Sequence, residues 1–410
     1  MNKEKVLKIF KDNEHVRYSG SKEELACANY FKNEIESLGL KADIEAFEVD
    51  DATITKAYLK TSLGDIKCKG YRLGAYTKEL TAPLYYLRDK KDLICLSEIK
   101  DKIVLMTGYF GKCIYQDLVK YGALAFITTT GIQSDSHEDI DDRELRKVVS
   151  KDTVKLPGLN INIKDAVRLI NEDVKEVTLA IEGEDYKTNS HNVITVIEGE
   201  VKEKIVLTAH YDTVPLSKGI YDNLSGAVGI LELIERFSKE KPHFTLEFVL
   251  CGSEERGLLG SKAYVKTKKL DDIRLVVNLD MIGCTLGQSI ACCTSAMDVV
   301  HYIDIMSKEL GYPIHAYQDV YSSDSTPFAD KGIPAISFAR IDPNDMELIH
   351  NRYDTSELMN VKNLFEDIDF IYTFTKRMAN AKVFPIKKEM PQNMKDELDI
   401  YLLRKKKEEK

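Results

Sequence analysis

Residues 205–261 read IVLTAHYDTVPLSKGIYDNLSGAVGILELIERFSKEKPHFTLEFVLCGSEERGLLGS, and this stretch decides the predicted fold. An apolar run ends at His210, a turn-rich segment carries Asp222, and a second apolar run is followed by Glu254 and Glu255. Short apolar runs bounded by turn residues are typical of buried strands. A histidine and three acidic residues just past strand ends indicate a site for cations.

Strands and helices alternate through this stretch and beyond it. The predicted elements are strand Lys204–Ala209, helix Leu224–Glu240, strand Phe244–Cys251, helix Leu258–Lys268 and strand Ile273–Leu279. Strands separated by helices of this size predict right-handed βαβ crossovers and a largely parallel sheet of the α/β class. In such sheets, ligands bind beyond the carboxyl ends of the strands. We therefore expect His210, Glu254, Glu255 and Asp280 at one edge of the sheet.

The residue types at this edge indicate the chemistry. Imidazole and carboxylate ligands suit Zn²⁺, Co²⁺ or Mn²⁺. Two cations about 3.5–4 Å apart need a bridging carboxylate and a shared water of lowered pKa. Asp222, in a turn before a helix, is the candidate bridge. Only one of Glu254 and Glu255 needs to bind metal, and the other can carry a proton to a leaving amine. Asp212 is placed to orient the imidazole of His210.

Each of these residues taken alone has an ordinary structural explanation. A histidine at a strand end is usually a hydrogen-bonded surface group, Asp-Asn before a helix is usually a turn and cap, and Glu-Glu is usually solvated. The other histidines lack a partner motif, and we interpret them as structural or solvated. They are His15, His137, His191, His243, His301 and His315. The occurrence of the polar groups at successive strand ends favours the metal site.

Length and composition define the class of protein. The 410 residues exceed what one hydrophobic core usually supports, so two domains are expected. A net charge of -9 argues against nucleic acid or an anionic membrane as the main partner. The sequence has neither a signal-peptide pattern nor an apolar run long enough to span a membrane, which predicts a cytoplasmic location. The eight cysteines contain no CxxC pair and are interpreted as reduced, buried thiols.

The remaining patterns give the predicted organisation of the chain. A catalytic domain would comprise residues 1–52 and 171–386, an inserted β-rich domain residues 53–170, and a charged tail residues 387–410. The tail is interpreted as a solvated or frayed helix. Val177–Ile181 and Asn192–Ile197 are predicted to form a hairpin around the charged turn Glu182–Lys187.

Several motifs occur in an order that resembles the di-zinc exopeptidases related to bacterial leucyl aminopeptidase and glutamate carboxypeptidase. The motifs are Arg17-Tyr18-Ser19-Gly20-Ser21, His210-Tyr211-Asp212, Asp222-Asn223-Leu224-Ser225-Gly226, Glu254-Glu255-Arg256-Gly257, Asp280-Met281, Ser323-Asp324-Ser325-Thr326-Pro327-Phe328 and His350-Asn351-Arg352-Tyr353-Asp354-Thr355. They span nearly all of the predicted catalytic domain. The resemblance implies a three-layer fold with a mixed, mostly parallel sheet and helices on both faces.

The resemblance also implies roles for single residues. Two Zn²⁺ ions would be bound, one by His210 and Asp280 and the other by Glu255 and His350, with Asp222 as the bridge. Glu254 would be the general base and Asp212 would support His210. A cis peptide would follow Asp222. The inserted segment is similar to the protease-associated domain, because Lys102-Ile103-Val104-Leu105 and the run from Leu118 to Thr128 match its strand-helix-strand pattern.

Three positions depart from the family pattern. Ile349 occupies the place where relatives often have a tyrosine that stabilises the tetrahedral intermediate, and Tyr353 or Tyr321 is the candidate replacement. Ser322 and Ser325 stand where relatives often have arginine and histidine.

Three classes of function remain open. The first is an aminopeptidase that acts on peptides, with Co²⁺ or Mn²⁺ as substitutes for Zn²⁺. The second is a carboxypeptidase or deacylase of the same family, which the loss of the arginine at Ser322 disfavours. The third is a non-catalytic binding protein, which the complete ligand set disfavours. The partners expected are a peptide substrate, with no nucleic acid and no membrane, and a homo-oligomer is left open.

Overall fold

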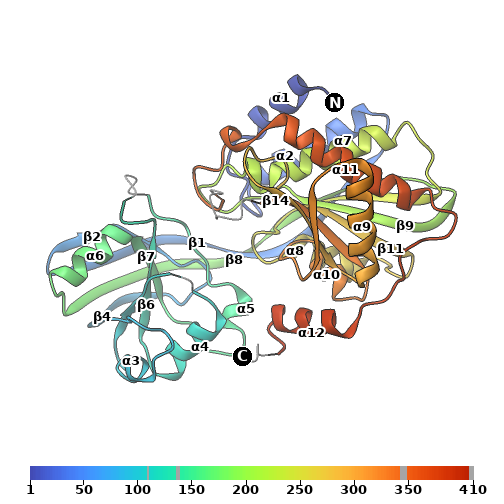
Figure 1. The fold of residues 1–410 in the computed structure, drawn as a ribbon. Helices are drawn as coiled ribbons and strands as arrows, with labels where there is room; N and C mark the ends of the chain where they lie inside the picture. The colour runs from blue at the N-terminus through green and yellow to red at the C-terminus, as the bar shows by residue number, and fades with distance from the viewer. Residues whose placement is uncertain (109, 135–138, 342–348, 406–410) are drawn as a thin grey trace. The chain divides into compact units, whose positions relative to one another are not determined.

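The computed structural model describes residues 1–108, 110–134, 139–341 and 349–405 of the chain (Figure 1). The chain divides into two compact units, one formed by Met1–Val49 with Asn189–Lys410 and the other by Asp50–Thr188. An inserted unit is therefore present, as the sequence predicts. Its second boundary lies at Thr188 instead of residue 170, because the strand that leaves the inserted unit is longer than expected.

The larger unit is built on a mixed, mostly parallel sheet. Its strands, in spatial order, are β13 (Ile314–Gln318), β12 (Gln288–Thr294), β14 (Ala335–Ile341), β11 (Ile273–Leu279), β9 (Val201–His210), β10 (Phe244–Cys251) and β8 (Glu176–Ile197). Strands β14, β11, β9 and β10 are parallel neighbours, and β12 pairs in parallel with β13. The β8–β10 and β12–β14 pairs are antiparallel. The α/β prediction is confirmed.

Helices cover both faces of this sheet. The helices are α1 (Lys3–Asn13), α2 (Lys22–Ser37), α7 (Ser225–Phe237), α8 (Leu259–Thr267), α9 (Met297–Leu310), α10 (Thr326–Ala329), α11 (Val361–Ala379) and α12 (Gln392–Tyr401). Leu207 of β9 points into a cluster that contains Phe31 of α2 and Phe374 of α11, whereas its neighbour Val206 points into one that contains Tyr264 of α8. This alternation gives the three layers, because successive side chains of a strand point to opposite faces.

Local sequence signals set the two ends of helix α2 in the first part of the larger unit. The hydroxyl of Ser21 caps α2 by accepting a hydrogen bond from the amide of Glu24, and the glycine that follows the helix, Gly39, has φ 82°. Serine N-caps and positive-φ glycines are the usual boundaries of helices. These signals set the start and the end of α2. After Gly39 the chain enters β1 (Ala42–Thr61).

The inserted unit contains paired strands and two apolar clusters. Its strands are β2 (Gly64–Ile66), β3 (Cys68–Gly70), β4 (Thr77–Tyr86), β5 (Ile103–Leu105), β6 (Ala125–Thr130) and β7 (Gly158–Asn162), together with parts of β1 and β8, and its helices are α3 (Leu93–Ser97), α4 (Lys112–Lys120), α5 (Lys147–Ser150) and α6 (Ile163–Asn171). The pairing order within it is β8-β4-β5-β6-β7-β3. The predicted strand-helix-strand pattern from Ile103 to Thr128 corresponds to β5, α4 and β6.

Two sequence predictions are wrong. Residues 182–187 do not turn, because β8 is one continuous strand from Glu176 to Ile197. Gly183 lies where this strand approaches β1, and a Cβ atom there would meet the Thr53 carbonyl oxygen at 2.3 Å. The second error concerns the tail, in which Met390, Met394 and Leu398 are buried on and beside α12. Their spacing of four residues is the pattern of an amphipathic helix.

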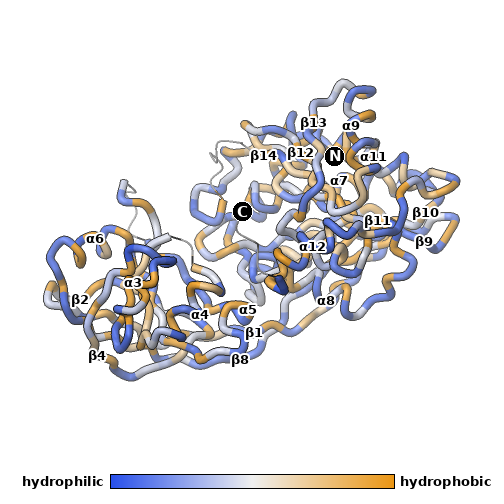
Figure 2. The backbone as a smooth tube through the Cα atoms, turned by 60° about the horizontal axis from the view of Figure 1, so that its bottom comes forward, coloured by the Kyte–Doolittle hydropathy of each residue, from blue (hydrophilic) through white to orange (hydrophobic). Residues whose placement is uncertain are grey.

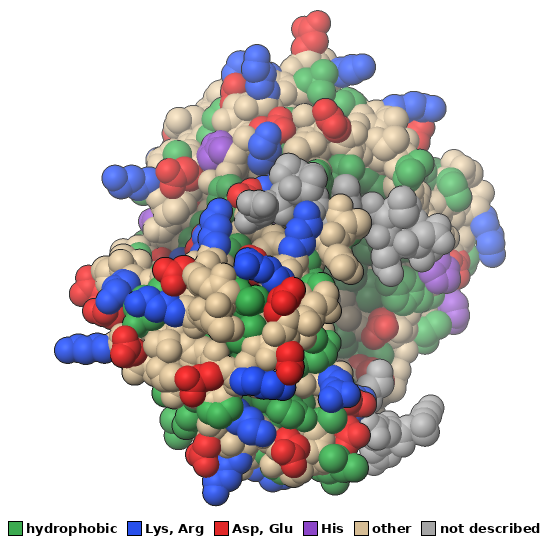
Figure 3. Space-filling model, turned by 90° about the vertical axis from the view of Figure 1, so that its left-hand side faces the viewer, with side chains coloured by type: hydrophobic (Ala, Val, Ile, Leu, Met, Phe, Trp, Pro, Cys, Tyr) green, Lys and Arg blue, Asp and Glu red, His purple; other side chains and the backbone are tan. Residues whose placement is uncertain are grey.

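The distribution of charged and hydrophobic residues is that expected for a protein with a mixed-charge surface and buried helix faces. On the face shown in Figure 3, basic and acidic side chains are interspersed. The trace of α11 in Figure 2 alternates between hydrophobic and hydrophilic residues, as expected for a helix that buries one face. No helix in the described part of the chain is long and apolar enough to cross a membrane.

Candidate metal centre

The structure brings together the five side chains that the sequence predicts as ligands, each supplied by a different segment. His210 ends β9, and Asp222 lies in the short helical turn η1 (Ile220–Leu224) before α7. Glu255 follows β10, Asp280 follows β11, and His350 lies between β14 and α11. The strand ends of a parallel sheet meet at one edge, which explains how His210, Glu255 and Asp280 come together although they are far apart in the chain.

The five side chains form two groups that share one carboxylate. His210 Nε2 lies 3.2 Å from Asp222 Oδ1 and 3.5 Å from Asp280 Oδ1. His350 Nε2 lies 3.0 Å from Asp222 Oδ2 and 3.1 Å from Glu255 Oε2. Within each group the potential ligand atoms all lie within 4.8 Å of one another. Each oxygen of Asp222 thus faces a different histidine, which is the arrangement of a carboxylate that bridges two cations.

The donor set fits divalent metal ions. Asp280 Oδ1 is buried and makes no hydrogen bond to any described residue. A buried carboxylate oxygen without a hydrogen-bond donor is costly unless a cation neutralises it. Two imidazoles and three carboxylates suit Zn²⁺ and similar ions. The carboxylates also act on the imidazoles: burial lowers the pKa of His350, but Glu255 and Asp222 outweigh it and raise that pKa to about 11.

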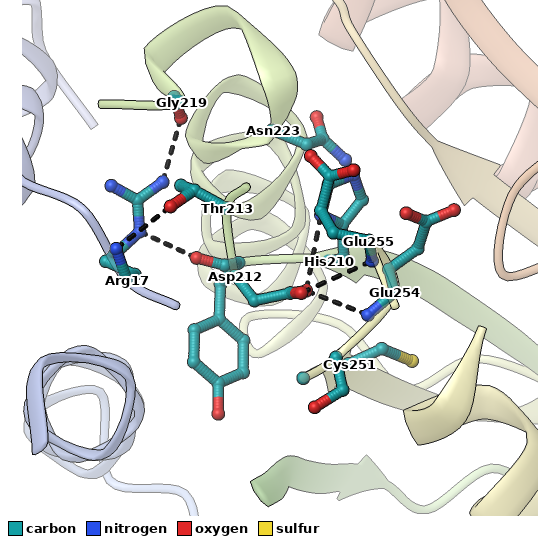
Figure 4. Close-up of polar contacts among 12 residues, drawn as sticks. Arg17, His210, Asp212, Thr213, Gly219, Asn223, Cys251, Glu254 and Glu255 are labelled. Carbon is teal, nitrogen blue, oxygen red and sulfur yellow. Dashed lines mark hydrogen bonds and ion pairs between the residues drawn. The ribbon is translucent and has the colours of Figure 1, made fainter. Parts of the chain in front are cut away.

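Asp212 contacts the backbone of Glu254 and Glu255 in addition to His210, the one contact that the sequence predicts. Its Oδ1 accepts a hydrogen bond of 2.9 Å from the Glu254 amide, and its Oδ2 accepts one of 3.3 Å from the Glu255 amide (Figure 4). Its Oδ1 also lies 3.5 Å from His210 Nδ1. One fully buried carboxylate therefore fixes the end of β9 against the Glu254-Glu255 turn that follows β10.

Glu254 is the acidic residue of the turn that belongs to neither ligand group. Its side chain is buried, and burial together with the negative charges of Glu255, Asp324 and Asp280 raises its pKa well above the usual range, against the opposing effect of His210. A carboxylate with a raised pKa is a stronger proton acceptor than a solvated one. The geometry therefore separates the two glutamates, with Glu255 beside His350 and Glu254 available to move a proton.

The loop that carries Asp222 is fixed by the side chains of Asp354 and Asn223, for which no role was predicted. The carboxylate of Asp354 accepts hydrogen bonds from the amides of Tyr221 (2.7 Å) and Asp222 (3.0 Å). The side chain of Asn223 donates to the Leu279 carbonyl and accepts from the amide of Met281, on either side of Asp280. The peptide between Asp222 and Asn223 is cis, as the family resemblance implies.

Arg17 supports the same region from the N-terminal segment. Its guanidinium is fully buried and donates to the main-chain carbonyls of Asn13, His15, Tyr211, Lys218 and Gly219. Figure 4 shows the contacts with Gly219 and with the strand end that carries Asp212. These contacts involve all three guanidinium nitrogens, so the loop from residue 211 to residue 219 depends on this side chain.

Several residues beside the site have backbones in the left-handed region. Ser253, directly before Glu254, has φ 57°, Met281, directly after Asp280, has φ 61°, and His350 has φ 57°. Non-glycine residues with positive φ are uncommon and cluster at functional sites, where the surrounding structure compensates for the strain.

Tyr321 and Asp324 lie in the segment between β13 and β14, and charges of the site residues act on both. The hydroxyl of Tyr321 is buried and has no hydrogen-bond partner among the described residues, and burial and the charges of Asp280 and Asp222 raise its pKa. Burial and nearby carboxylates raise the pKa of Asp324 to about 7. The other candidate, Tyr353, is 40% exposed.

The remaining histidines stand outside both ligand groups of the described residues. His243 contacts Glu200, and His315 stacks on Tyr317. Burial lowers the pKa values of His15 and His191, which favours their neutral forms. His137 lies outside the described residues.

Comparisons with known proteins agree with this geometry. The family model described as Peptidase family M28 matches residues 192–372. Aminopeptidase YwaD of Bacillus subtilis (strain 168) is 27% identical over 402 residues, which cover 93% of this chain and 85% of that protein. The solved structure of BSAP, a zinc aminopeptidase from Bacillus subtilis, has a TM-score of 0.76 at 24% identity and covers 94% of this chain and 97% of that one.

A second solved structure, an aminopeptidase from Aneurinibacillus sp. strain AM-1, has a TM-score of 0.71 at 22% identity and covers 94% of this chain and 96% of that one. These two structural similarities show that the fold is shared along nearly the whole chain, inserted unit included. Both ligand groups lie within the span from His210 to His350, inside the region that the family model matches. Residues 192–372, which contain both ligand groups, are therefore similar to peptidase family M28.

Proposed function

We propose that this protein is a di-zinc metallo-aminopeptidase that releases N-terminal residues from peptides. The observation that carries the proposal is the pair of ligand groups that share Asp222, with Glu254 beside them and outside both groups. His210, Asp280 and Asp222 would hold one zinc ion, and Asp222, Glu255 and His350 the other. Bound there, the two ions supply Lewis acidity toward the scissile carbonyl and lower the pKa of an attacking water.

Glu254 moves the proton in this proposal. It takes a proton from the attacking water and returns it to the nitrogen of the leaving peptide, which departs as an amine. Its backbone is fixed by the hydrogen bond from its amide to Asp212, so its side chain stays directed toward the site. The raised pKa of Glu254 suits this role, because a carboxylate with a raised pKa accepts a proton more readily than a solvated one.

Tyr321 is the proposed hydrogen-bond donor to the carbonyl oxygen of the scissile bond. Its buried hydroxyl has no partner among the described residues, although it lies where Asp280 and Asp222 act on it. A donor that is already positioned stabilises the negative charge that develops on that oxygen. In this way Tyr321 would replace the tyrosine that relatives often have at the position of Ile349.

Other parts of the chain support related proposals. We propose that the unit formed by Asp50–Thr188 is a protease-associated-like domain, on the basis of the β5-α4-β6 arrangement. The eight cysteines are all free, which supports a reducing, cytoplasmic location. Co²⁺ and Mn²⁺ would substitute for Zn²⁺, because the ligand set contains only imidazole and carboxylate groups.

A panel of substrates tests the proposed function. Leucine p-nitroanilide and other amino-acid p-nitroanilides would be compared with N-acetylated p-nitroanilides and with N-acylated amino acids, each with and without a chelator. We expect hydrolysis only of substrates with a free α-amine, loss of activity with chelator, and recovery with zinc. Hydrolysis of the N-acylated amino acids would instead support a carboxypeptidase or deacylase. Inactivity on every substrate by a zinc-loaded protein would favour the non-catalytic alternative.

A further inference from the structure

The C-terminal helix α12 packs against the segment Gln318–Asp330, which leads from the end of β13 through α10. Met394 and Leu398 of this helix are buried in an apolar cluster that also contains Phe328 and Ala329 of α10. The trace of α12 in Figure 2 alternates between hydrophobic and hydrophilic residues, as this one-sided packing requires. The helix is therefore part of the larger unit's core.

Polar contacts connect α12 and the residues after it to three points along this segment. Asn393 donates a hydrogen bond of 2.7 Å to the side-chain oxygen of Gln318, at the start of the segment. Arg404 pairs with Asp330, at its end, through two contacts of 2.5 and 2.8 Å. A pair of two parallel N–H···O contacts has more defined geometry than a single surface ion pair.

The third contact lies in the middle of the segment. The hydroxyl groups of Ser322 and Tyr401 are 2.5 Å apart. Ser322 directly follows Tyr321, so Tyr401 constrains the backbone of the residue that we propose as the donor to the substrate. The C-terminal helix thus holds the segment at both ends and next to its functional tyrosine.

The opposite side of the same segment is bonded to the central sheet. The hydroxyl of Ser323 accepts a hydrogen bond of 2.9 Å from Asn278 of β11, and the hydroxyls of Ser325 and Ser337 of β14 are 2.8 Å apart. Along the chain, Tyr321 lies between the contact of Gln318 with α12 and the contacts of Ser322 and Ser323. The segment is therefore clamped between the sheet and the C-terminal helix.

We propose that α12 is a brace that positions Tyr321 for the reaction, with Tyr401 and Arg404 as positioning residues. This inference rests on the proposed function of the site. The contacts of α12 and Arg404 described above are with Gln318, Ser322, Asp330 and the apolar cluster, and in the described part of the chain none of these residues belongs to either ligand group. Loosening the brace therefore lowers the rate of the chemical step without releasing metal. A catalytic group displaced by about 1 Å can reduce the rate by about 100-fold, so a small shift of Tyr321 is sufficient.

A charge-swap experiment tests the brace in the full-length, zinc-loaded protein. The variants are Arg404→Asp, Asp330→Arg and the double variant, which restores the pair with reversed charges. Lys405→Asp is the matched control, because it makes the same charge change at the neighbouring position. Lys405 is similarly exposed (53% against 52%), and within the described residues its ion pairs are with Asp396 and Asp399. Tyr401→Phe removes only the hydroxyl that contacts Ser322.

Three quantities would be measured for each variant. Amide hydrogen exchange of residues 318–330 reports whether the segment is held, independently of activity. Zinc content reports whether the metal ligands are affected, and kcat and KM for leucine p-nitroanilide separate turnover from binding. We expect faster exchange and a fall in kcat of about 10-fold in both single charge variants and in Tyr401→Phe, with zinc content unchanged. The double variant recovers most of the slow hydrogen exchange and most of the kcat of the parent protein. Lys405→Asp matches the parent protein in both quantities.

The outcomes distinguish the brace from the proposed function. Unchanged hydrogen exchange in Arg404→Asp and Tyr401→Phe would overturn the proposal that α12 is a brace. Faster exchange with an unchanged kcat would also overturn it, because α12 would then hold the segment without positioning Tyr321. Loss of zinc in proportion to loss of activity would also overturn it. If the parent protein hydrolyses no substrate, the proposed function fails and the positioning role fails with it, while the exchange data still show whether α12 holds the segment.

Discussion

Replacing Asp354 tests how the bridging carboxylate is held. Both oxygens of Asp354 accept hydrogen bonds from successive amides, those of Tyr221 and Asp222, and all three residues are buried. Asp354→Ala leaves both amides without an acceptor in a place that water cannot easily reach. Each unsatisfied buried donor costs about 1–3 kcal/mol, so we expect a loss of about 2–6 kcal/mol in the free energy of unfolding. The free energy of unfolding of a typical protein is only about 5–15 kcal/mol.

The same substitution acts on metal binding. Asp354 lies four residues after His350 and bonds to the amide of Asp222, so it connects two of the three segments that supply one ligand group. Removing a residue that orients a ligand typically lowers metal affinity by about 10- to 100-fold. We expect this decrease for the site that contains His350. Asp354→Asn, which keeps one acceptor and turns an NH₂ group toward the other amide, falls between the parent protein and Asp354→Ala.

Two assays check these magnitudes. Urea denaturation of chelator-treated protein gives the change in stability without metal, and competition with a chromophoric chelator gives the zinc affinity. Asp43→Ala is the control, because Asp43 is 57% exposed and its one described ion pair, with Lys41, is on the surface. A loss of stability below about 1 kcal/mol in Asp354→Ala, or an unchanged zinc affinity, would refute the reasoning.

Further substitutions test other parts of the site. Glu254→Gln should retain both zinc ions, measured by atomic absorption, and lose at least about 100-fold in kcat, because the amide cannot accept the proton; near-full activity would exclude Glu254 as the base. Tyr321→Phe should lower kcat by about 10- to 1000-fold while KM changes little, and unchanged turnover would eliminate it as the donor. Arg17→Lys should destabilise the protein by more than about 2 kcal/mol in urea, because an ammonium group cannot reach five carbonyls; a change within about 0.5 kcal/mol would contradict its supporting role. Burial raises the pKa of Glu24 to about 8, so its proton binds more tightly in the folded state than in the unfolded state. This contribution to the free energy of unfolding is complete below about pH 4.5 and is lost as the pH rises through 8. Urea denaturation of Glu24→Gln at several pH values should lack this pH dependence.

The sequence contains the information for the ligands but little for what holds them. His210, Glu255 and Asp280 could be predicted because each follows an apolar run, and the parallel arrangement places such positions at one edge. Asp222 could be proposed as a bridge only from its residue type and its turn. His350 came from the family resemblance, since no strand signal precedes it directly.

The supporting contacts could not be predicted, because they depend on distances between segments far apart in the chain. Asp354 and Asn223 hold backbone amides and carbonyls, which carry no sequence signal of their own. The path of β8 was also missed, because a charged, glycine-containing run is typical of a turn, and only the approach of β1 explains why Gly183 lies in a strand. For α12, the mixed charges of the tail concealed the spacing of Met390, Met394 and Leu398.

The placement of the ligands at strand ends links metal concentration to folding. His210 and His350 are separated by 140 positions, and between them lie β10, β11, β12, β13 and β14. An unfolded chain cannot keep these groups within one coordination sphere, so metal binds the folded state preferentially. Preferential binding stabilises that state by about 2.7 kcal/mol when free metal is at 100 times its dissociation constant. The concentration of free zinc would thus influence the free energy of unfolding of this protein, in addition to its activity.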